Sequence, residues 1–426
     1  MNNKTVVPKL RFQEFCGKWS IKPLGSECNH ISYGLTIRPD FIEDGIPLIS
    51  AREITSGKVN IDIAPKISFS DFDKLSDKAK PKKGDVFLTK TGTIGFSAIF
   101  TENIPIAITQ NIAVIRVNNI NENLPLYILH YFKTRNFYRS AISRVNQSTI
   151  MDLQLGDIKK LLIPFPPLPE QQKIASFLSA VDEKIQQLSR KKELLEQYKK
   201  GLMQQLFSGK LRFKDGNGND YADWEEKTFG DIYSFYTTNS LSREKLNYDS
   251  GAVKNIHYGD IHTKFKTLFD VNEEVVPFVN SDFDISKIKS ECYCQEGDLV
   301  IADASEDYAD IGKSIEIINL QNEKIVAGLH TFLARPNKTE MYVGFSGYKV
   351  RSENFRKQIM IIAQGSKVLS ISTGRLAMIK MKIPVIEEQQ KIAVFLSSID
   401  ANIESTNQQI TQTQTFKKGL LQQLFV

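Results

Sequence analysis

Two segments of the chain carry apolar residues at the alternating four- and three-residue spacing of a helix that packs against another helix. One stripe runs from Leu178 to Leu206 and the other from Leu396 to Leu424, and polar residues interrupt both. Each helix should be about 38 residues long, or roughly 57 Å at 1.5 Å per residue. A narrow stripe needs a partner helix. Because the first helix leads from the first half of the chain to the second, and the second helix leads back, the pattern predicts an antiparallel coiled coil.

The same two segments form an internal repeat. Residues 170–207 and 388–425 are identical at 19 of 38 aligned positions, with an offset of 218. The segments that precede them match more faintly, as where Lys9-Leu10-Arg11-Phe12 returns at 210–213. The chain therefore reads as A, B, A′, B′, and a repeat at this period governs the whole fold. The junction at 204–213 joins a motif that recurs near the C-terminal end of the chain to a motif that also occurs near its N-terminal end. We therefore expect the two ends to lie close together, as the two motifs do at the junction.

The repeat sets the expected domains: 1–162 and 211–382 as two similar diverged domains, and 163–210 and 383–426 as the two long helices. The diverged domains alternate short β-rich runs with turns and a few helical stretches. We predict β-rich runs at 46–50, 85–89, 112–117, 253–256, 298–301 and 329–334, and helices at 126–141 and 353–362. The fold class is therefore α+β: two similar domains, each a mixed sheet plus helices, joined by an antiparallel coiled coil with pseudo-two-fold symmetry.

Charge is distributed unevenly over the 426 residues, whose formal net charge is +6. Residues 1–162 hold 22 Lys and Arg against 15 Asp and Glu, whereas residues 211–382 hold 22 against 25. A basic domain suits a polyanion such as DNA. No apolar run is long enough to span a membrane, no secretory signal is visible, and the four cysteines lack zinc spacing, so we expect a reduced, cytoplasmic protein.

The sequence offers little catalytic chemistry. It has no phosphate-binding glycine loop, no zinc-protease motif and no nucleophile elbow. His257 and His262 form a local pair without a third metal ligand nearby. An acidic cluster at 303–310 leaves open a metal-dependent nuclease site, although an ordinary acidic loop is the commoner explanation. We therefore expect no catalytic residues and no bound metal.

Two diverged domains, each followed by a nearly identical long helix, resemble the specificity subunit of type I restriction-modification enzymes. The most specific match is the segment 167–175, with Glu170-Gln171-Gln172-Lys173-Ile174-Ala175 repeated at 388–393. The resemblance implies two target recognition domains that each read one half of a split, asymmetric DNA target. It also implies a non-catalytic chain that docks two modification (methyltransferase) subunits and two restriction subunits. S-adenosylmethionine, ATP and Mg²⁺ would then belong to those partners, with no cofactor on this chain.

Residues that read base edges need hydrogen-bonding or aromatic side chains on exposed loops. Any single candidate could equally be an ordinary solvated loop residue. The candidates are Tyr33, Ser50, Arg52, Lys90, Thr91, Thr93, Asn111, Gln147 and Ser148 in the first domain, and His257, Tyr258, His262, Ser305, Gly365, Ser366 and Lys367 in the second.

Near-identity of the two helix starts favours symmetric docking of a partner over mere helix surface. The candidate docking residues are Glu170, Gln171, Gln172, Lys173, Glu388, Gln389, Gln390 and Lys391. Two alternatives remain beside the specificity subunit: a stand-alone DNA-binding regulator, which needs no duplicated docking surface, and an enzyme with a metal site at 303–310.

Overall fold

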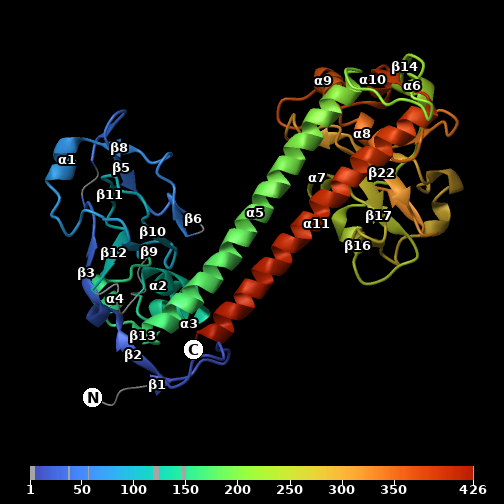
Figure 1. Cartoon of the computed structure of the whole chain (residues 1–426). Coiled ribbons are helices and arrows are strands. Elements are labelled where there is room, and N and C mark those ends of the chain that lie inside the picture. Colours follow the sequence, from blue (N-terminus) through green and yellow to red (C-terminus); the bar gives the residue numbers. More distant parts are fainter. Residues whose placement is uncertain (1–4, 37–38, 56, 119–123, 146–149, 426) are drawn as a thin grey trace. The chain divides into compact units, whose positions relative to one another are not determined.

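Two compact units make up the chain. The computed structural model describes residues 5–36, 39–55, 57–118, 124–145 and 150–425. Unit 1 comprises residues 1–189 and 408–426, and unit 2 comprises residues 190–407. Both predicted long helices are present, α5 (Leu168–Phe207) and α11 (Ile386–Leu424), and each unit contains one half of each helix (Figure 1).

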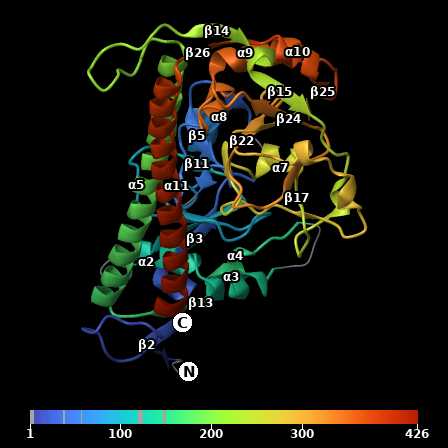
Figure 2. The ribbon, with the colours of Figure 1, turned by 90° about the vertical axis from the view of Figure 1, so that its right-hand side faces the viewer.

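The two long helices pack antiparallel in both units (Figures 1 and 2). In unit 1, Lys417 of α11 donates to Asp182 of α5. In unit 2, Lys199 of α5 donates to Asp400 of α11 at 2.5 Å. These two ion pairs are the same contact with the helices exchanged, because 182 and 199 each recur 218 residues later. The pairs explain two of the polar interruptions of the apolar stripe, Lys199 and Lys417, whose charges help to fix the register.

Short strands dominate unit 1. Its two four-stranded sheets have the orders β10-β9-β12-β3 and β11-β5-β8-β4, and β1-β2-β13 forms a third sheet. Within the second sheet β11 runs parallel to β5, while its other pairs are antiparallel. The elements are β1 (Thr5–Val6), β2 (Trp19–Pro23), β3 (Cys28–Tyr33), β4 (Phe41–Ile42), β5 (Ile46–Ile49), β6 (Ile54–Thr55), β7 (Lys58–Val59), β8 (Lys66–Ile67), α1 (Phe69–Asp73), β9 (Val86–Thr89), β10 (Ser97–Ile99), β11 (Ala107–Ile108), β12 (Ile112–Val117), α2 (Pro125–Phe132), α3 (Arg135–Ile142), α4 (Leu155–Lys159) and β13 (Leu162–Phe165).

Unit 2 repeats this plan. Its main sheet is β15-β24-β20-β22-β18, and β16-β19-β17-β23 again contains one parallel pair, β17 with β23. The elements are β14 (Glu225–Thr228), α6 (Phe229–Ile232), β15 (Tyr233–Tyr236), β16 (Leu246–Asn247), β17 (Lys254–Ile256), α7 (Tyr258–Thr263), β18 (Leu268–Asp270), β19 (Phe278–Val279), β20 (Leu299–Ala302), β21 (Ala304–Ser305), β22 (Ser314–Asn319), β23 (Ile325–Ala327), β24 (Thr331–Pro336), α8 (Ser346–Lys349), α9 (Glu353–Ile362), β25 (Leu369–Ser370), α10 (Thr373–Ala377) and β26 (Lys380–Ile383).

The long helices are part of the hydrophobic core of each unit. In unit 1 the buried residues Leu178 of α5 and Leu424 of α11 belong to the same cluster as Trp19 and the sheet residue Val86. In unit 2 a second cluster joins both helices to β20 and β24 in the same way. Because each core is completed by helix residues, the long helices hold the sheets of each unit in a fixed position. This confirms the predicted α+β fold of two similar domains joined by paired long helices.

Candidate nucleic-acid interface

Five backbone segments meet at one edge of unit 1, which we call edge 1: residues 33–35, 49–53, 89–95, 109–111 and 151–153. The amide of Thr109 donates to Ile49 at 3.0 Å, which joins the ends of the parallel strands β5 and β11. The amide of Lys90 donates to Asn111 at 2.8 Å, and its carbonyl accepts from Leu153 at 2.8 Å. The strand ends and the loop before α4 therefore form one continuous surface of loops.

At the centre of edge 1 lies a charged network. The ammonium of Lys90 is 2.9 Å from Asp152, and the hydroxyl of Thr91 donates to the same carboxylate at 2.5 Å. The ring of Tyr33 lies 5.9 Å from the Lys90 ammonium. Burial alone would raise the pKa of Asp152. The hydrogen bonds from the Thr91 hydroxyl and the Lys90 ammonium outweigh this effect and hold that pKa below its usual range. Edge 1 thus combines an exposed aromatic ring with a neutralised acid–base pair.

Unit 2 builds the same backbone frame at edge 2, which comprises residues 236–239, 256–258, 302–305, 328–330 and 369–371. The amide of Gly328 donates to Ile256 at 2.9 Å, as Thr109 does to Ile49. The amide of Asp303 donates to His330 at 3.1 Å, and its carbonyl accepts from Ile371 at 3.0 Å. Asp303 therefore stands where edge 1 has Lys90, and His330 stands where edge 1 has Asn111.

The side chains of edge 2 have different chemistry. The Nδ1 atom of His330 is 3.2 Å from the carboxylate of Asp303, and its ring lies 5.4 Å from that of Tyr258. Tyr258 also contacts the rings of His257, at 4.7 Å, and His262, at 6.1 Å. Burial raises the pKa of Asp303 above its ordinary value, and the nearby His330 offsets this only in part. Edge 2 is therefore an aromatic and histidine surface around one carboxylate.

Most of the predicted base-reading residues lie on these two edges. Tyr33, Arg52, Thr93, Gly365, Ser366 and Lys367 are exposed, and Ser50, Thr91, Asn111, Tyr258, His262 and Ser305 are half-buried. The hairpin that carries Gly365, Ser366 and Lys367 is tied to edge 2, since β25 pairs with β21. Gln147 and Ser148 lie outside the described residues.

Two candidates do not lie on exposed loops, and that part of the prediction is wrong. Lys90 is only 8% exposed and its ammonium is held by Asp152. His257 is also 8% exposed, and its Nδ1 atom accepts the amide hydrogen of Gly259 at 3.1 Å, which caps the start of α7. Both side chains are used to shape the edges, because a polar group buried this deeply needs a partner within the protein.

Three residues of the edges are not predicted as base readers by the sequence: Asp152, Asp303 and His330. Asp303 is predicted only as a part of the acidic cluster, and Asp152 and His330 carry no local signal of their own. His330 has a left-handed backbone conformation with φ of +55°, which is uncommon for a residue other than glycine. His330 holds the position in unit 2 that Asn111 holds in unit 1, and this equivalence is visible only when the strands of the two units are aligned.

The duplicated helix starts hold each domain on its own helix. In unit 1, Arg11 donates two hydrogen bonds to Glu170, both 2.7 Å long, and the indole nitrogen of Trp19 donates to the same carboxylate at 3.0 Å. Gln171 accepts from the amide of Leu124 at 3.0 Å. We call this cluster joint 1.

Joint 2 repeats these contacts in unit 2. Arg212 and Trp224 donate to Glu388 at 2.7 and 3.0 Å, and Gln389 accepts from the amide of Tyr342 at 2.9 Å. Glu170, Gln171, Glu388 and Gln389 are at most 1% exposed. The prediction that these four residues form a docking surface is therefore wrong, because their side chains are used within the chain. Of the candidate docking residues, Gln172, Lys173 and Gln390 are exposed and Lys391 is half-exposed.

The acidic cluster of unit 2 does not form a metal site. Asp310 pairs with Lys313 at 3.3 Å, and Asp307 accepts the amide hydrogen of Ala309. Among the described residues no three histidine, cysteine or acidic side chains are grouped so that they could hold a metal ion. None of the helices in the described part of the chain is long and apolar enough to cross a membrane.

Several known proteins share this architecture. A specificity subunit of Methanocaldococcus jannaschii, provisionally named for the type I restriction enzyme MjaX, is 26% identical over 97% of this chain and 94% of its own length. The crystal structure of a type I restriction-modification S subunit from M. genitalium matches with a TM-score of 0.58 and 16% identity, over 99% of both chains. A structure from a study of complex assembly in a type I system matches with a TM-score of 0.57 and 16% identity, over 95% of this chain and 96% of its own.

The model of one protein family matches both halves of the repeat. It covers residues 19–197 and 221–414, which include the two edges, the tryptophan, glutamate and glutamine of each joint, and most of both long helices. Two domains that recognise different DNA sequences need different side chains, and they can share one backbone frame, as the two edges do. The chain belongs to the family defined by the type I restriction-modification DNA specificity domain, and it contains two copies of that domain.

Proposed function

We propose that this chain reads an asymmetric DNA target in two separate halves, edge 1 contacting one half and edge 2 the other. The observation that carries the proposal is that one frame of backbone hydrogen bonds presents Lys90, Thr91 and Asp152 in unit 1 but Asp303 and His330 in unit 2. Base edges are distinguished by the donor and acceptor pattern that they present. Two edges with different donors and acceptors should therefore select different bases.

The residues proposed to touch DNA are the exposed and half-buried members of the two edges. Tyr33, Arg52 and Thr93 are exposed members of edge 1, and Lys367 is an exposed residue of the hairpin tied to edge 2. The buried Lys90 and His257 help to fix the shape of the edges through their contacts with Asp152 and Gly259. Backbone phosphates are expected to bind the basic surface of residues 1–162, which supplies affinity without sequence preference.

The proposal extends to the complex in which the chain would act. It assigns the chemistry to other subunits: two modification subunits that use S-adenosylmethionine, and two restriction subunits that use ATP and Mg²⁺. This chain would supply target recognition and the surface on which they assemble. One structural relative comes from a study of complex assembly in a type I system, and this supports the arrangement by analogy.

Sequencing of methylated bases in the host tests the proposal. A host that carries this gene should show a split, asymmetric methylation motif that disappears when the gene is deleted. Replacing residues 1–162 with the matching domain of a relative should change one half of the motif only. A chimera that changes both halves, or a motif unaffected by deletion, would contradict the proposal.

A further inference from the structure

Edge 2 presents a carboxylate at the place where edge 1 presents a neutralised pair. In unit 1 the carboxylate of Asp152 lies 2.9 Å from the ammonium of Lys90. In unit 2 the pairing of β21 with β25 puts the uncharged Ser370 at the place of Asp152, beside Asp303. Among the residues that the structure describes, Asp303 pairs with no lysine or arginine. The repeat has therefore replaced a neutral pair by an acid at the same backbone position.

The Asp303 carboxylate has one oxygen engaged within the chain and one oxygen that is not. Its Oδ1 atom lies 3.2 Å from Nδ1 of His330. Because a carboxylate ion only accepts hydrogen bonds, that Nδ1 atom carries the hydrogen. Within the described part of the chain, no hydrogen bond reaches Oδ2. The side chain of Asp303 is 24% exposed and that of His330 is 52% exposed. The pair thus leaves one acceptor for a donor outside the chain.

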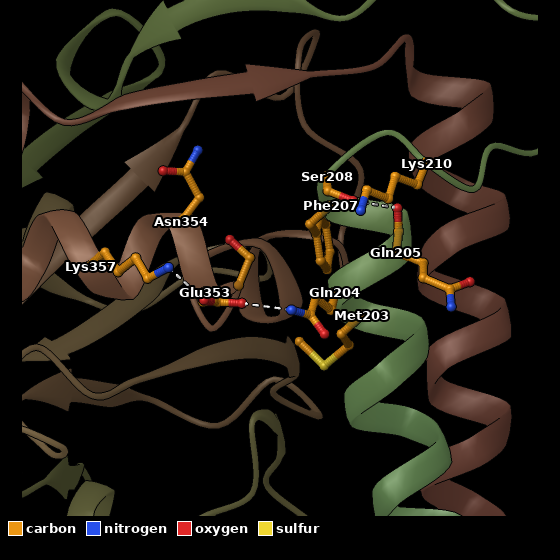
Figure 3. Close-up of a pocket in the computed structure, with 10 residues that line it drawn as sticks. Met203, Gln204, Gln205, Phe207, Ser208, Lys210, Glu353, Asn354 and Lys357 are labelled. Carbon is orange, nitrogen blue, oxygen red and sulfur yellow. Dashed lines mark hydrogen bonds and ion pairs between the residues drawn. The ribbon is translucent and has the colours of Figure 1, made fainter.

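The backbone around Asp303 is fixed on both sides. Its amide donates to His330 at 3.1 Å, and its carbonyl accepts from Ile371 at 3.0 Å. The segment of Ile371 follows helix α9, which is attached to α5 because Gln204 donates to Glu353 at 3.1 Å (Figure 3). A side chain that distinguishes bases must be held within about 0.5 Å of its working position. The frame around Asp303 meets that requirement.

An acidic side chain at a DNA interface has a restricted choice of contacts. The phosphates repel it, and so do the acceptor atoms that guanine and thymine present in the major groove. The donors that base edges present there are the N4 amino group of cytosine and the N6 amino group of adenine. A carboxylate at edge 2 is therefore suited to a base that carries an exocyclic amino group.

The atoms beside the two amino groups favour cytosine. Across an A·T pair, N6 lies between two acceptors, N7 of adenine and O4 of thymine, and both repel a carboxylate. Across a C·G pair, N4 has an acceptor on one side only, O6 of guanine. Since Oδ1 already accepts from His330, Asp303 offers one oxygen to one donor, which matches the pattern of cytosine.

Resting on the proposed function, we infer that Asp303 determines specificity in edge 2 by accepting a hydrogen bond from the N4 amino group of a cytosine. This cytosine lies in the half of the target that unit 2 reads. His330 is a positioning residue, because its bond to Oδ1 orients the carboxylate. The ring of Tyr258 packs 5.4 Å from the ring of His330 and restricts its movement.

Removal of a single amino group tests the inference. Methylation sequencing gives the split target, and exchange of residues 1–162 identifies the half that unit 2 reads. The full chain, in complex with the modification subunit of its own system, is then titrated with altered duplexes. In these, each cytosine of that half is replaced in turn by a pyrimidinone that lacks only the amino group. One replacement should weaken binding about tenfold in the unmodified chain. The same replacement should have no further effect in Asp303→Ala, which lacks the acceptor.

Two further variants separate base reading from charge. In Asp303→Asn the side chain keeps its size and the oxygen that accepts from His330, but an NH₂ donor takes the place of Oδ2. The preference for cytosine should therefore be lost. Glu306→Gln is the matched control, because it removes the same charge at an exposed position nearby and should keep that preference. Every variant should retain the base preferences of the half read by unit 1, which shows that the variants fold.

Different outcomes reject different claims. If the split target is bound but Asp303→Ala shows the same tenfold loss as the unmodified chain, Asp303 does not read cytosine, and the proposed function stands. Dependence on an adenine amino group, or on no amino group in that half, would likewise overturn the assignment. Equal loss of preference in Glu306→Gln would attribute the effect to charge alone and reject the base contact. If the host shows no split motif, the proposed function fails, and the assignment fails with it.

Discussion

The two joints and the two edges differ in how closely one unit copies the other. Joint 2 keeps the arginine, the tryptophan, the glutamate and the glutamine of joint 1, with hydrogen bonds of nearly the same length. Edge 2 keeps only the backbone bonds of edge 1 and exchanges Lys90 for Asp303 and Asn111 for His330. Duplicated sequence has therefore been preserved where a domain is attached to its helix and has changed where the strands end in loops.

This difference separates two requirements that act on one fold. A buried carboxylate with two charged or polar donors tolerates little change, because loss of one partner leaves another buried group unpaired. Loops at strand ends can change side chains while backbone bonds hold their shape. The predictions that follow test whether the joints are interchangeable and whether the edges are not.

Removing the joint carboxylate should have the largest effect. Glu170→Ala leaves Arg11 and the Trp19 indole without their common acceptor, and should destabilise unit 1 by about 3–5 kcal/mol. Glu388→Ala should destabilise unit 2 by a similar amount. Urea unfolding, monitored by hydrogen exchange of the amides in each unit, measures both losses of stability. Gln172→Ala, at the neighbouring exposed position, is the control and should change stability by less than about 0.5 kcal/mol. Clearly unequal losses would mean that the joints are not equivalent.

Changing edge 1 should weaken binding to one half of the target only. Arg52→Ala should weaken binding of the intact target by about 1–3 kcal/mol if the guanidinium contacts a guanine. Lys90→Ala should also weaken binding, because it leaves the Asp152 carboxylate uncompensated at the edge that we propose faces DNA. Titrations at several salt concentrations distinguish a base contact from a phosphate contact, which would weaken all sequences alike and reduce the salt slope. Unaltered affinity in both variants would remove these residues from the interface.

Unit 1 should be sensitive to acid at a place where unit 2 is not. Burial lowers the pKa of His130 to about 3, and Tyr348 stands at the matching place of unit 2. An unfolded histidine has a pKa near 6.5, so the unfolded chain binds the proton that the folded unit excludes. The stability of unit 1 should thus fall as the pH drops below about 6.5, by up to about 2 kcal/mol at pH 5.

Glu316 should act in the opposite direction in unit 2. Burial raises its pKa to about 8, although the amides of Gly344 and Gly347 donate to it. Stability from this residue is therefore present at acidic pH and is lost as the pH rises towards 8. Hydrogen exchange of α2 and β22 at pH 7 and pH 5, corrected for intrinsic rates, measures the two responses. His130→Gln should remove the extra acid response of α2, and an unchanged response would exclude His130 as its source.

The smallest effect is expected at the exposed part of the duplicated helix starts. Lys173→Glu breaks a 3.3 Å ion pair with Glu14, and Lys391→Glu breaks a bond to the carbonyl of Lys214. Such exposed contacts contribute at most about 1 kcal/mol to stability. If this surface also touches the modification subunits, the double reversal should weaken their docking at two equivalent places. Normal assembly of the double variant would exclude this surface as a docking site.

The regular elements could be predicted where the sequence pattern is local. The stretch at 112–117 is β12 and the stretch at 353–362 is α9, because their apolar spacing is uninterrupted. The predicted helix at 126–141 is instead two helices, α2 and α3. The hydroxyl of Thr134 accepts from the amide of Phe137 and starts α3 anew, a signal that apolar spacing conceals.

The candidate sites were harder to predict because their partners are distant in the sequence. Glu170 looked like an exposed helix residue since its partner Trp19 is 151 positions away. One signal was available: Arg11 and Trp19 recur in the second half together with the glutamate that they bind. Residues that repeat together across a duplicated chain can mark a contact within the chain as readily as a surface for a partner.

The charged pairs between the long helices have a consequence for shorter forms of this protein. Helix α5 carries both an acid, Asp182, and a base, Lys199. Asp182 corresponds in the repeat to the acid of α11 that pairs with Lys199, and Lys199 corresponds to the base of α11 that pairs with Asp182. Two copies of α5 laid antiparallel would therefore set Asp182 of each against Lys199 of the other. A fragment that ends after α5 holds a self-complementary seam, and two such fragments could form a symmetric dimer that reads the same half-site twice, as a palindrome.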